Sequence, residues 1–311
     1  MGNPRTAVIV NPHSANRRTG KRWPAAAGQL RVAIGGFDTF FTERPGHASA
    51  LAKRLAEEGC TRIIAAGGDG TVNEIVNGLL DEDGNALNSD VTLGVLPLGT
   101  GGDFRRSLGL TGLSDGIQAV AAGNIRQIDA GRVSFRAHDG KPARRYFANL
   151  VSFGMGGEVA MRARNALGSF GGKAAFLYAT ISVFFSYRPK AVRLHLGSEE
   201  DARVFRVLNV AVGNGRFHGG GMHVCPRAAL HDGLLEVTVI DALGMLTLLK
   251  DLPVLYSDNI YQHPKTHHFR VQRLAADSDQ RTSIEVDGEP LGTLPLEISV
   301  LPGRLRLFSK E

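Results

Sequence analysis

The chain has 311 residues, of which 43% are hydrophobic and 21% charged, and it carries a formal net charge of +6. These values are typical of a globular chain with a buried core, long enough for two domains of ordinary size. With only two cysteines, a disulfide framework is not indicated, and a reducing cytosol is the simplest compartment.

The net positive charge suits an acidic partner. A nucleotide, an anionic membrane surface and a nucleic acid all qualify, and charge alone does not choose among them. The N-terminal stretch lacks the long apolar segment of a signal peptide. The longest apolar run, at 174–187, is shorter than the roughly 18 residues that a membrane-spanning helix needs. We therefore expect no membrane-spanning helix.

The first part of the chain alternates strand and helix patterns. Apolar strands are predicted at 6–10, 38–41, 62–66 and 92–96, and helices at 46–58 and 115–122. A polar, basic turn is predicted at 14–22, directly after the first strand. This rhythm predicts a parallel sheet with helices on its faces, in which ligands bind at the carboxyl ends of the strands.

Two glycine-rich loops follow neighbouring strands of this part. The first contains Gly67, Gly68, Asp69 and Gly70 and leads into a helix, and the second lies at 97–103. Glycines here can take positive φ and leave no side chain in the way of a ligand. The loop N–H groups and the helix N-terminus then form a phosphate site, and the two loops can face one triphosphate from two sides. Neither loop has the P-loop or the dinucleotide pattern.

After about residue 127 the pattern changes to many short strands, which indicates an antiparallel sandwich at 128–300. The strands are predicted at 125–134, 145–153, 191–196, 204–212, 234–240, 266–271, 282–286 and 296–300. One long helix is predicted from about Glu158 to Tyr187, either as a core helix or as the flank of a lipid-accepting cleft. His218, His223 and Cys225 lie in one glycine-rich loop, and their spacing matches no standard zinc pattern.

The motifs in these loops are specific. GGDGTVNE at 67–74, followed by LPLGTGGDFRRSL at 96–108, resembles the catalytic domain of the diacylglycerol kinase and sphingosine kinase family, most closely the soluble bacterial YegS-type lipid kinases. The resemblance continues through NPHSANRRTG at 11–20, GNGRFHGGGM at 213–222, HDGLLEV at 231–237 and VDGEP at 286–290. The chain departs from the family pattern at Ala15, where Gly is usual, at Gly102, where Asn is usual, and at Glu158, where Asp is usual.

The resemblance implies an α/β domain at 1–127 that binds ATP and is rejoined by the last strand, within 301–311. It also implies a β-sandwich domain at 128–300 that binds the lipid. The implied activity is the Mg²⁺-dependent transfer of phosphate from ATP to the hydroxyl of a diacylglycerol- or sphingosine-like lipid. Such transfer depends on positioning and on neutralising charge more than on covalent chemistry by the protein.

The expected nucleotide site is built on the two glycine-rich loops, with further contacts after the first and second strands. Asp69 is expected to position the catalytic Mg²⁺, directly or through water, because this cation prefers carboxylate oxygen and keeps several waters. The candidate nucleotide contacts are Asn11, Thr42, Gly67, Gly68, Asp69, Gly70, Thr71, Asn73, Gly99 and Thr100.

Two further acids complete the candidate site. The acceptor is an alcohol, so a general base near it assists the reaction, and the family's proton acceptor corresponds to Glu289. On the residues alone a hairpin-turn acid is the better interpretation of Glu289, since the Asp-Gly pair before it is common in turns. Asp232 corresponds to the family's second Mg²⁺ site, with the backbone carbonyls of Ala229 and Leu234 as partners, and it too is followed by a turn glycine.

The expected partners are ATP, a lipid alcohol and the surface of an anionic membrane, in a cytoplasmic location with peripheral membrane contact and without nucleic acid. The oligomeric state is not fixed, and a homodimer stays open. Two other functions also stay open: an NAD kinase, which shares the GGDGT loop but phosphorylates a soluble ribose, and a non-catalytic nucleotide- or lipid-binding protein of the same fold. The motifs around Asp232 and Glu289 favour the lipid kinase.

Overall fold

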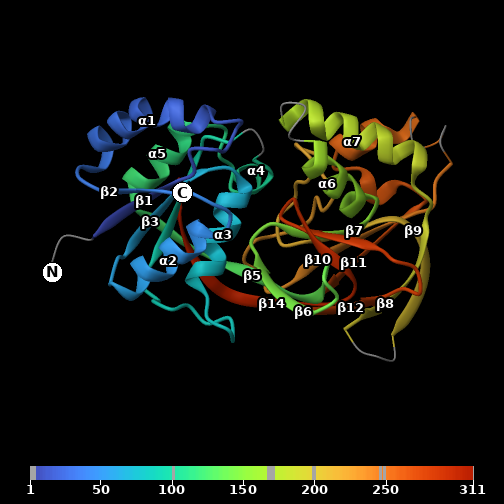
Figure 1. Cartoon of the computed structure of the whole chain (residues 1–311). Coiled ribbons are helices and arrows are strands. Elements are labelled where there is room, and N and C mark those ends of the chain that lie inside the picture. The colour runs from blue at the N-terminus through green and yellow to red at the C-terminus, as the bar shows by residue number, and fades with distance from the viewer. Residues whose placement is uncertain are drawn as a thin grey trace. The chain divides into compact units, whose positions relative to one another are not determined.

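The structure is a computed structural model that describes residues 5–99, 102–166, 172–197, 201–244, 247 and 250–310. The chain forms two compact units (Figure 1). One unit comprises Met1–Ala130 and Pro302–Glu311, and the other comprises Gly131–Leu301.

The first unit is a sheet covered by helices on both faces (Figure 1). Its strands are β1 (Thr6–Val10), β2 (Asp38–Phe41), β3 (Arg62–Gly67), β4 (Thr92–Pro97) and the end of β14 (Glu289–Ser309). They lie in the order β2-β1-β3-β4-β14, and every pair is parallel. The parallel order brings the loops after β1, β2, β3 and β4 to one edge of the sheet.

The described part of this unit contains five helices. α1 (Arg18–Ile34) and α5 (Leu113–Ala122) pack together on one face, and α2 (His47–Glu57) and α3 (Asp69–Leu79) pack together on the other. In α2 the buried Ala48, Leu51, Ala52 and Leu55 recur at helical spacing. The short α4 (Asp103–Ser107) follows the second glycine-rich loop.

The basic turn predicted at 14–22 is wrong in its second half, because α1 begins at Arg18. The buried Trp23, Ala26, Ala27 and Leu30 give this segment a helical stripe that faces the sheet. The polar residues at its start and the internal Pro24 hide that stripe in the sequence.

The second unit contains only antiparallel strand pairs among those described. Its strands are β5 (Asn124–Ala137), which begins in the first unit, β6 (Pro142–Phe147), β7 (Leu150–Gly154), β8 (Lys190–Leu196), β9 (Ala202–Gly213), β10 (Leu235–Asp241), β11 (Thr266–Val271), β12 (Arg273–Asp277), β13 (Ser283–Val286) and most of β14. The sheet-rich C-terminal part expected from the sequence is therefore confirmed.

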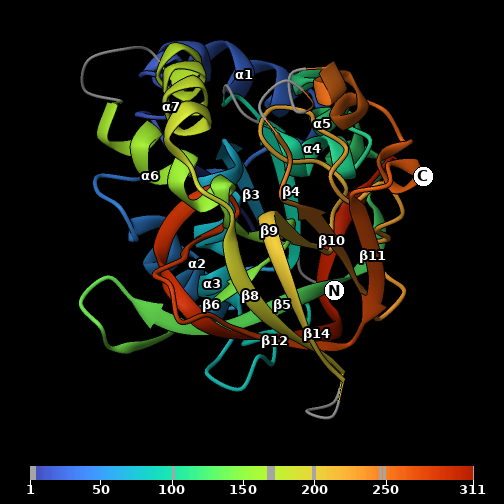
Figure 2. The ribbon, with the colours of Figure 1, turned by 90° about the vertical axis from the view of Figure 1, so that its right-hand side faces the viewer.

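Hydrogen bonding connects β7-β13-β14-β12-β8-β9 in a ring, because the long strand β9 pairs with β7 and then β8 along its length, and β14 pairs with β13 and then β12 (Figure 2). One apolar core fills the ring, and residues from β5 to β14 contribute to it. Phe147, Phe153 and Val210 are among its fully buried side chains.

Two strand predictions for the second unit differ from the structure. The strand predicted at 145–153 is two strands, because the carboxylate of Asp287 accepts hydrogen bonds from the N–H groups of Ala148, Asn149 and Leu150 and fixes a turn between them. Strand β12 was not predicted at all.

The long helix predicted at 158–187 is wrong: two helices occupy this region, α6 (Met155–Ala166) and α7 (Gly172–Ser186), and they pack against each other. The guanidinium of Arg162 donates to Ser182 Oγ at 2.6 Å. In one continuous helix these residues would be about 30 Å apart at 1.5 Å per residue. Glycines at 168, 171 and 172 made the sequence a poor continuous helix.

Candidate functional site

The loops after four parallel strands meet at one edge of the first unit. Gly99 N donates to Gly67 O at 2.8 Å, so the loop after β4 is bonded to the end of β3. Thr42 N donates to Val10 O, and Asn11 N donates to Ala66 O, which bring the ends of β2 and β1 to the same place. The two glycine-rich loops predicted to lie together are therefore in direct contact.

Close packing, and not a positive φ, requires glycine at Gly67 in the first loop and at Gly99 in the second. Neither Gly67 nor Gly68 adopts the positive φ expected for it, nor does Gly70. A Cβ on Gly67 would lie 2.4 Å from Thr71 Oγ1, and one on Gly99 would lie 2.5 Å from Gly68 Cα. The two loops thus approach each other more closely than a side chain at Gly99 would permit.

The N-terminus of α3 points its N–H groups out of this loop. Thr71 and Val72 donate the first bonds of the helix to Gly68 O, so the N–H groups of Asp69 and Gly70 precede the helical ladder. Asn11 Nδ2 donates to Thr71 Oγ1 at 3.1 Å, which leaves the hydroxyl hydrogen of Thr71 to be donated elsewhere. Together these donors and the helix dipole make an anion site.

Asp69 links the two glycine-rich loops through its side chain. Its Oδ2 accepts hydrogen bonds from Gly102 N at 3.0 Å and Asp103 N at 2.8 Å, so it caps α4. Burial, together with the nearby Asp103 charge, raises the pKa of this carboxyl, and the backbone hydrogen bonds oppose the rise. Gly102 has φ 128°, a conformation that suits glycine and not the asparagine usual in the family.

The remaining candidate nucleotide contacts have different positions. Asn73 is buried within α3 and its carbonyl and side-chain oxygens accept from Asn77 Nδ2, so it lies behind the loop. Thr42 is buried at the end of β2. Thr100 lies outside the described residues.

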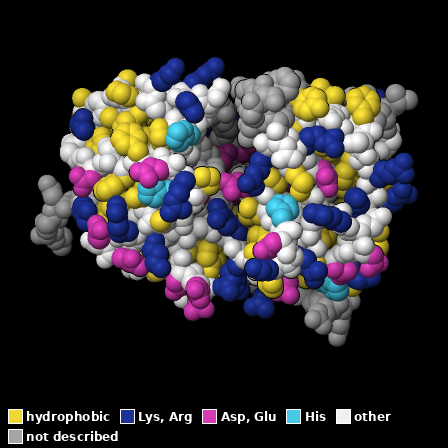
Figure 3. All heavy atoms as spheres, in the orientation of Figure 1, with side chains coloured by type: hydrophobic (Ala, Val, Ile, Leu, Met, Phe, Trp, Pro, Cys, Tyr) yellow, Lys and Arg dark blue, Asp and Glu magenta, His cyan; other side chains and the backbone are white. Residues whose placement is uncertain are grey.

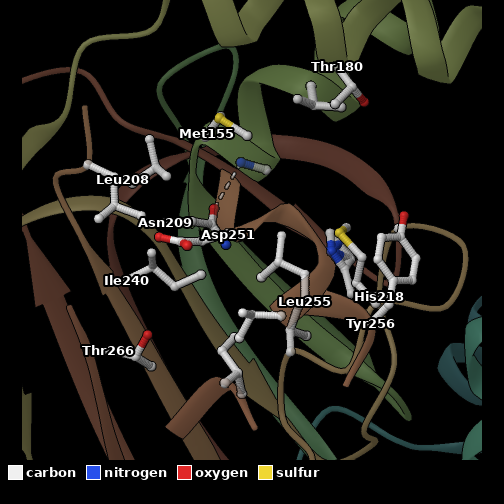
Figure 4. Close-up of a pocket in the computed structure, with 18 of the residues that line it drawn as sticks. Met155, Thr180, Leu208, Asn209, His218, Ile240, Asp251, Leu255, Tyr256 and Thr266 are labelled. Atoms are coloured by element: carbon white, nitrogen blue, oxygen red, sulfur yellow. Dashed lines mark hydrogen bonds between the residues drawn. The ribbon is translucent and has the colours of Figure 1, made fainter. Parts of the chain in front are cut away.

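The second unit contains an apolar pocket of about 320 Å³ (Figure 4). Helices α6 and α7 form one wall, and β9, β10 and the short helical turns at Leu252–Tyr256 and Ile260–Gln262 form the others. Figure 4 shows Leu208 and Ile240 on one side and His218 and Tyr256 on the other. The pocket is in the size range of small-molecule sites, which are mostly apolar with a few polar groups.

A β-bulge in β9 helps to build this pocket. Ile240 pairs with Asn209 and Asp241 with Val207, so Leu208 has no opposite residue. Both Leu208 and Asn209 therefore line the pocket, and Asn209 Oδ1 accepts a hydrogen bond from Gly156 N at 2.9 Å, which fixes the start of α6 (Figure 4).

Helix α7 presents different residues to three surroundings. Ala179 and Val183 pack in a small core that includes Val159 of α6. Thr180 and Phe184, four residues apart, line the pocket. Figure 3 shows apolar side chains at the surface over this helix, and the exposed large apolar residues there are Tyr178, Ile181 and Phe185.

Glu289 begins β14 in the hairpin after β13, and its side chain is 41% exposed, 4.0 Å from the guanidinium of Arg145. It pairs with Val286, whereas Glu285 pairs with Pro290. Because directly paired residues share a face, Glu289 lies on the opposite face of the hairpin from Glu285. Of these two acids, Glu285 lines the apolar pocket.

Asp232 does not present a vacant carboxylate. One oxygen accepts the N–H of Leu234 at 3.1 Å, and the other contacts the guanidinium of Arg270. Across the described ranges, no group of three or more His, Cys, Asp or Glu side chains is arranged to hold a metal ion. In this arrangement the Arg270 guanidinium lies against Asp232, and the magnesium site at Asp232, Ala229 and Leu234 stays a prediction.

Sequence reasoning missed the polar residues of the pocket, above all Glu285 and its partner His218. One signal could have found Glu285. It lies in a short strand just before the Asp-Gly turn, between the core residues Ile284 and Val286, and alternation along a strand puts it on the opposite face from them.

No helix among the described residues is long and apolar enough to span a membrane.

Comparisons with known proteins find the same family of lipid kinases over both units. Residues 149–309 match the YegS C-terminal NAD kinase beta sandwich-like domain, and residues 5–133 match the diacylglycerol kinase catalytic domain. A "Probable lipid kinase YegS-like" of Chromohalobacter salexigens is 30% identical over 98% of this chain and 93% of its own length. A diacylglycerol kinase of Staphylococcus saprophyticus is 27% identical over 98% of this chain and 95% of its own length.

Two solved structures share the fold. A diacylglycerol kinase from Bacillus anthracis covers 98% of this chain and 96% of its own, with a TM-score of 0.71 at 19% identity. Yeast NADH kinase complexed with NADH covers 99% of this chain and 84% of its own, with a TM-score of 0.51 at 11% identity. At these identities the likeness shows the fold alone.

Proposed function

Since the chain belongs to the YegS-like lipid kinase family, with its diacylglycerol kinase catalytic domain, and is a kinase, we propose that it transfers the γ-phosphoryl group of ATP to the hydroxyl of a diacylglycerol- or sphingosine-like lipid. The observation that carries the choice of a lipid is the apolar pocket, walled in part by α7, whose outer face is also apolar. A soluble sugar acceptor would gain nothing from such surfaces.

The first unit supplies the nucleotide site in this proposal. The N–H groups at the start of α3 and the Thr71 hydroxyl donate to phosphate oxygens, while Gly67 and Gly99 let the phosphates approach the backbone. These donors act as fixed positive charge and require no movement during transfer.

Asp69 is the residue that would hold Mg²⁺. Its Oδ2 is bonded to the second loop, so a metal contact would be made through Oδ1 or through water. When bound, Mg²⁺ would neutralise negative charge on the phosphates. The bonds to Gly102 and Asp103 orient the carboxylate.

Glu289 is proposed as the proton acceptor for the lipid hydroxyl, on the family resemblance alone. A solvent-accessible carboxylate near Arg145 can take a proton from an alcohol positioned beside it. Arg145 would hold the carboxylate in place.

We also propose peripheral contact between α7 and an anionic membrane. Tyr178, Ile181 and Phe185 follow at intervals of three and four residues, so they lie on one side of the helix. Arg188 and Lys190 come directly after it and can meet acidic headgroups. A lipid would thus be drawn from the bilayer next to the pocket.

The test is phosphorylation of dioctanoylglycerol, sphingosine and NAD by the purified protein with labelled ATP, the lipids being presented in anionic vesicles. We expect a lipid phosphate, and we expect Glu289→Gln to reduce kcat by about 10²–10⁴ with unchanged ATP affinity. Glu297→Gln, at an exposed position of the same strand, is the matched control.

Two results would replace the proposal. Phosphorylation of NAD and of no lipid indicates a nucleotide kinase, as the fold shared with yeast NADH kinase permits. Binding of ATP or lipid without any labelled product indicates a non-catalytic binding protein. Full turnover by Glu289→Gln would leave the lipid kinase standing and make Glu289 a turn residue only.

A further inference from the structure

Within the apolar pocket, one carboxylate is buried beside one imidazole. Glu285 is 2% exposed and lines the pocket together with His218. Glu285 Oε1 accepts the Ser152 hydroxyl at 2.8 Å and contacts His218 Nε2. Burial of a carboxylate costs free energy unless it is hydrogen-bonded, and here two donors converge on one oxygen.

These contacts fix the orientation of the His218 ring. A carboxylate only accepts hydrogen bonds, so Nε2 carries a proton and donates to Glu285. The backbone N–H of His218 donates to Met222 O at 2.9 Å, which fixes the residue in its loop. The ring is therefore held at Nε2, and its second nitrogen, Nδ1, has no hydrogen-bond partner among the described residues.

A second histidine of the pocket differs in this respect. His263 Nε2 bonds to Asp251 Oδ2 at 3.1 Å, and its Nδ1 accepts the N–H of Lys265 at 3.2 Å. Both nitrogens of His263 are used by the protein. His218 is thus the pocket histidine that offers a ring nitrogen to an occupant.

We propose that His218, held by Glu285 and Ser152, positions a hydroxyl group of the lipid within the apolar pocket. A hydroxyl both donates and accepts, so it pairs with Nδ1 whether the imidazole is neutral or charged, whereas an ester carbonyl only accepts. This inference rests on the proposed lipid kinase function, and it makes His218 a positioning residue of the acceptor site.

The hairpin geometry separates this role from that of Glu289. Glu285 faces the pocket, and Glu289 lies on the opposite face of the same hairpin. Loss of His218 should therefore weaken lipid binding, and loss of Glu289 should slow proton removal.

The experiment uses His218→Gln and His218→Leu in the full chain. Gln retains an amide that can donate to Glu285 but has no second ring nitrogen, and Leu removes both contacts. For His218→Gln we expect a lipid KM about 2- to 10-fold higher, the value of one net hydrogen bond, with the KM for ATP unchanged. His195→Gln, on β8 and paired with Asp277 outside the pocket, is the control and should leave both constants unchanged.

Two lipids with the same acyl chain identify the hydroxyl. Dioctanoylglycerol has one hydroxyl and monooctanoylglycerol has two. An equal rise in KM for both shows that His218 contacts the hydroxyl that is phosphorylated, and a rise for monooctanoylglycerol alone shows that it contacts the second one. An unchanged KM for both lipids, in variants whose melting temperature shows that they are folded, overturns the proposal.

Binding without turnover separates this proposal from the proposed function. Calorimetry compares monooctanoylglycerol with its analogue that lacks both hydroxyls. Tighter binding of the alcohol by the unmodified protein, abolished in His218→Gln, supports the role of His218 even if no lipid is phosphorylated. Equal binding of both compounds by the unmodified protein overturns it, even if the lipid kinase activity is found.

Discussion

Gly99 lies so close to Gly68 that a Cβ atom on Gly99 would come within 2.5 Å of Gly68 Cα and 2.9 Å of Gly68 N. The contact joins the loop after β4 to the loop after β3, from which the phosphate site is built. Both neighbouring atoms belong to the backbone, so no side-chain movement relieves the clash. The packing of the two loops therefore depends on the absence of a side chain at Gly99.

Gly99→Ala should separate the two loops and lower ATP affinity by at least about tenfold, which corresponds to about 1.4 kcal/mol. Calorimetric titration with ATP measures the loss, and thermal unfolding shows whether the variant is folded. Gly28→Ala is the matched control, because Gly28 lies in α1 with nothing within 4 Å of the added Cβ, and it should not lower stability. Unchanged ATP affinity in folded Gly99→Ala would remove the loop contact from the nucleotide site.

Ala15→Gly should stabilise the protein by about 0.5–1 kcal/mol. Ala15, Asn16 and Arg17 are consecutive residues with φ between 55° and 64°, a left-handed conformation that is unfavourable for residues with a Cβ. Ala25→Gly should instead destabilise the protein by about 1 kcal/mol, since Ala25 is exposed inside α1, where glycine is less favourable than alanine. Denaturant unfolding of both variants provides the measurement, and a destabilised Ala15→Gly would contradict the assigned backbone strain.

Asp69→Asn should change how stability depends on pH. Burial, reinforced by Asp103, raises the pKa of Asp69 above its ordinary value of 3.8, so the folded protein holds this proton more tightly than the unfolded chain. The free energy of unfolding contributed by Asp69 is therefore highest below that ordinary value and falls as the pH rises through the raised pKa.

Asparagine cannot ionise, yet its side-chain oxygen can still accept from Gly102 and Asp103. The melting temperature of Asp69→Asn relative to the unmodified protein should therefore rise from about pH 4 towards neutral pH and then remain constant. Thermal unfolding at intervals of half a pH unit tests this. A difference that does not vary with pH would mean that the pKa of Asp69 is not raised.

The double variant Ile181→Ser/Phe185→Ser should bind anionic vesicles about 10- to 100-fold more weakly, because the side chains lose the free energy of entering the apolar layer. Its melting temperature should not change, since Phe185 is 69% exposed and Ile181 is 50% exposed. Val32→Ser, at a 90% exposed position of α1, is the control for removing surface apolar area. Equal vesicle binding by all three proteins would exclude α7 as the membrane contact.

Asp232→Asn should lower the melting temperature by the same amount in Mg²⁺ and in a chelator, because Arg270 supplies the positive charge at this position. The Arg270 guanidinium contacts Asp232 and lies 3.6 Å from Glu236 Oε2, a buried carboxylate whose pKa is raised by burial. Asp277→Asn, which breaks the more open pair with Arg193, should have a smaller effect. A penalty for Asp232→Asn that is larger in Mg²⁺ would favour the magnesium site implied by the family resemblance.

The sequence alone determined the elements with strong periodicity and the loops that punctuate them. Strands 6–10, 38–41 and 266–271 coincide with β1, β2 and β11, because alternating or continuous apolar runs bounded by Pro, Gly or Thr leave few other conformations. The paired glycine-rich loops followed in the same way, since both come directly after neighbouring strands. Family resemblance, and not periodicity, carried the assignment of Asp69 and Glu289.

Tertiary structure decided everything that depends on contacts between distant residues. The turn between β6 and β7 exists because Asp287, about 140 positions away, accepts three backbone N–H groups. The 158–187 segment folds into two helices because α6 and α7 bury apolar faces against each other. His218 and Glu285 are 67 positions apart, and the sequence around neither residue indicates that the two side chains are in contact. Such pairs form only when the pleat of β13 and the loop after β9 bring the two side chains into one pocket, and local sequence carries no record of that.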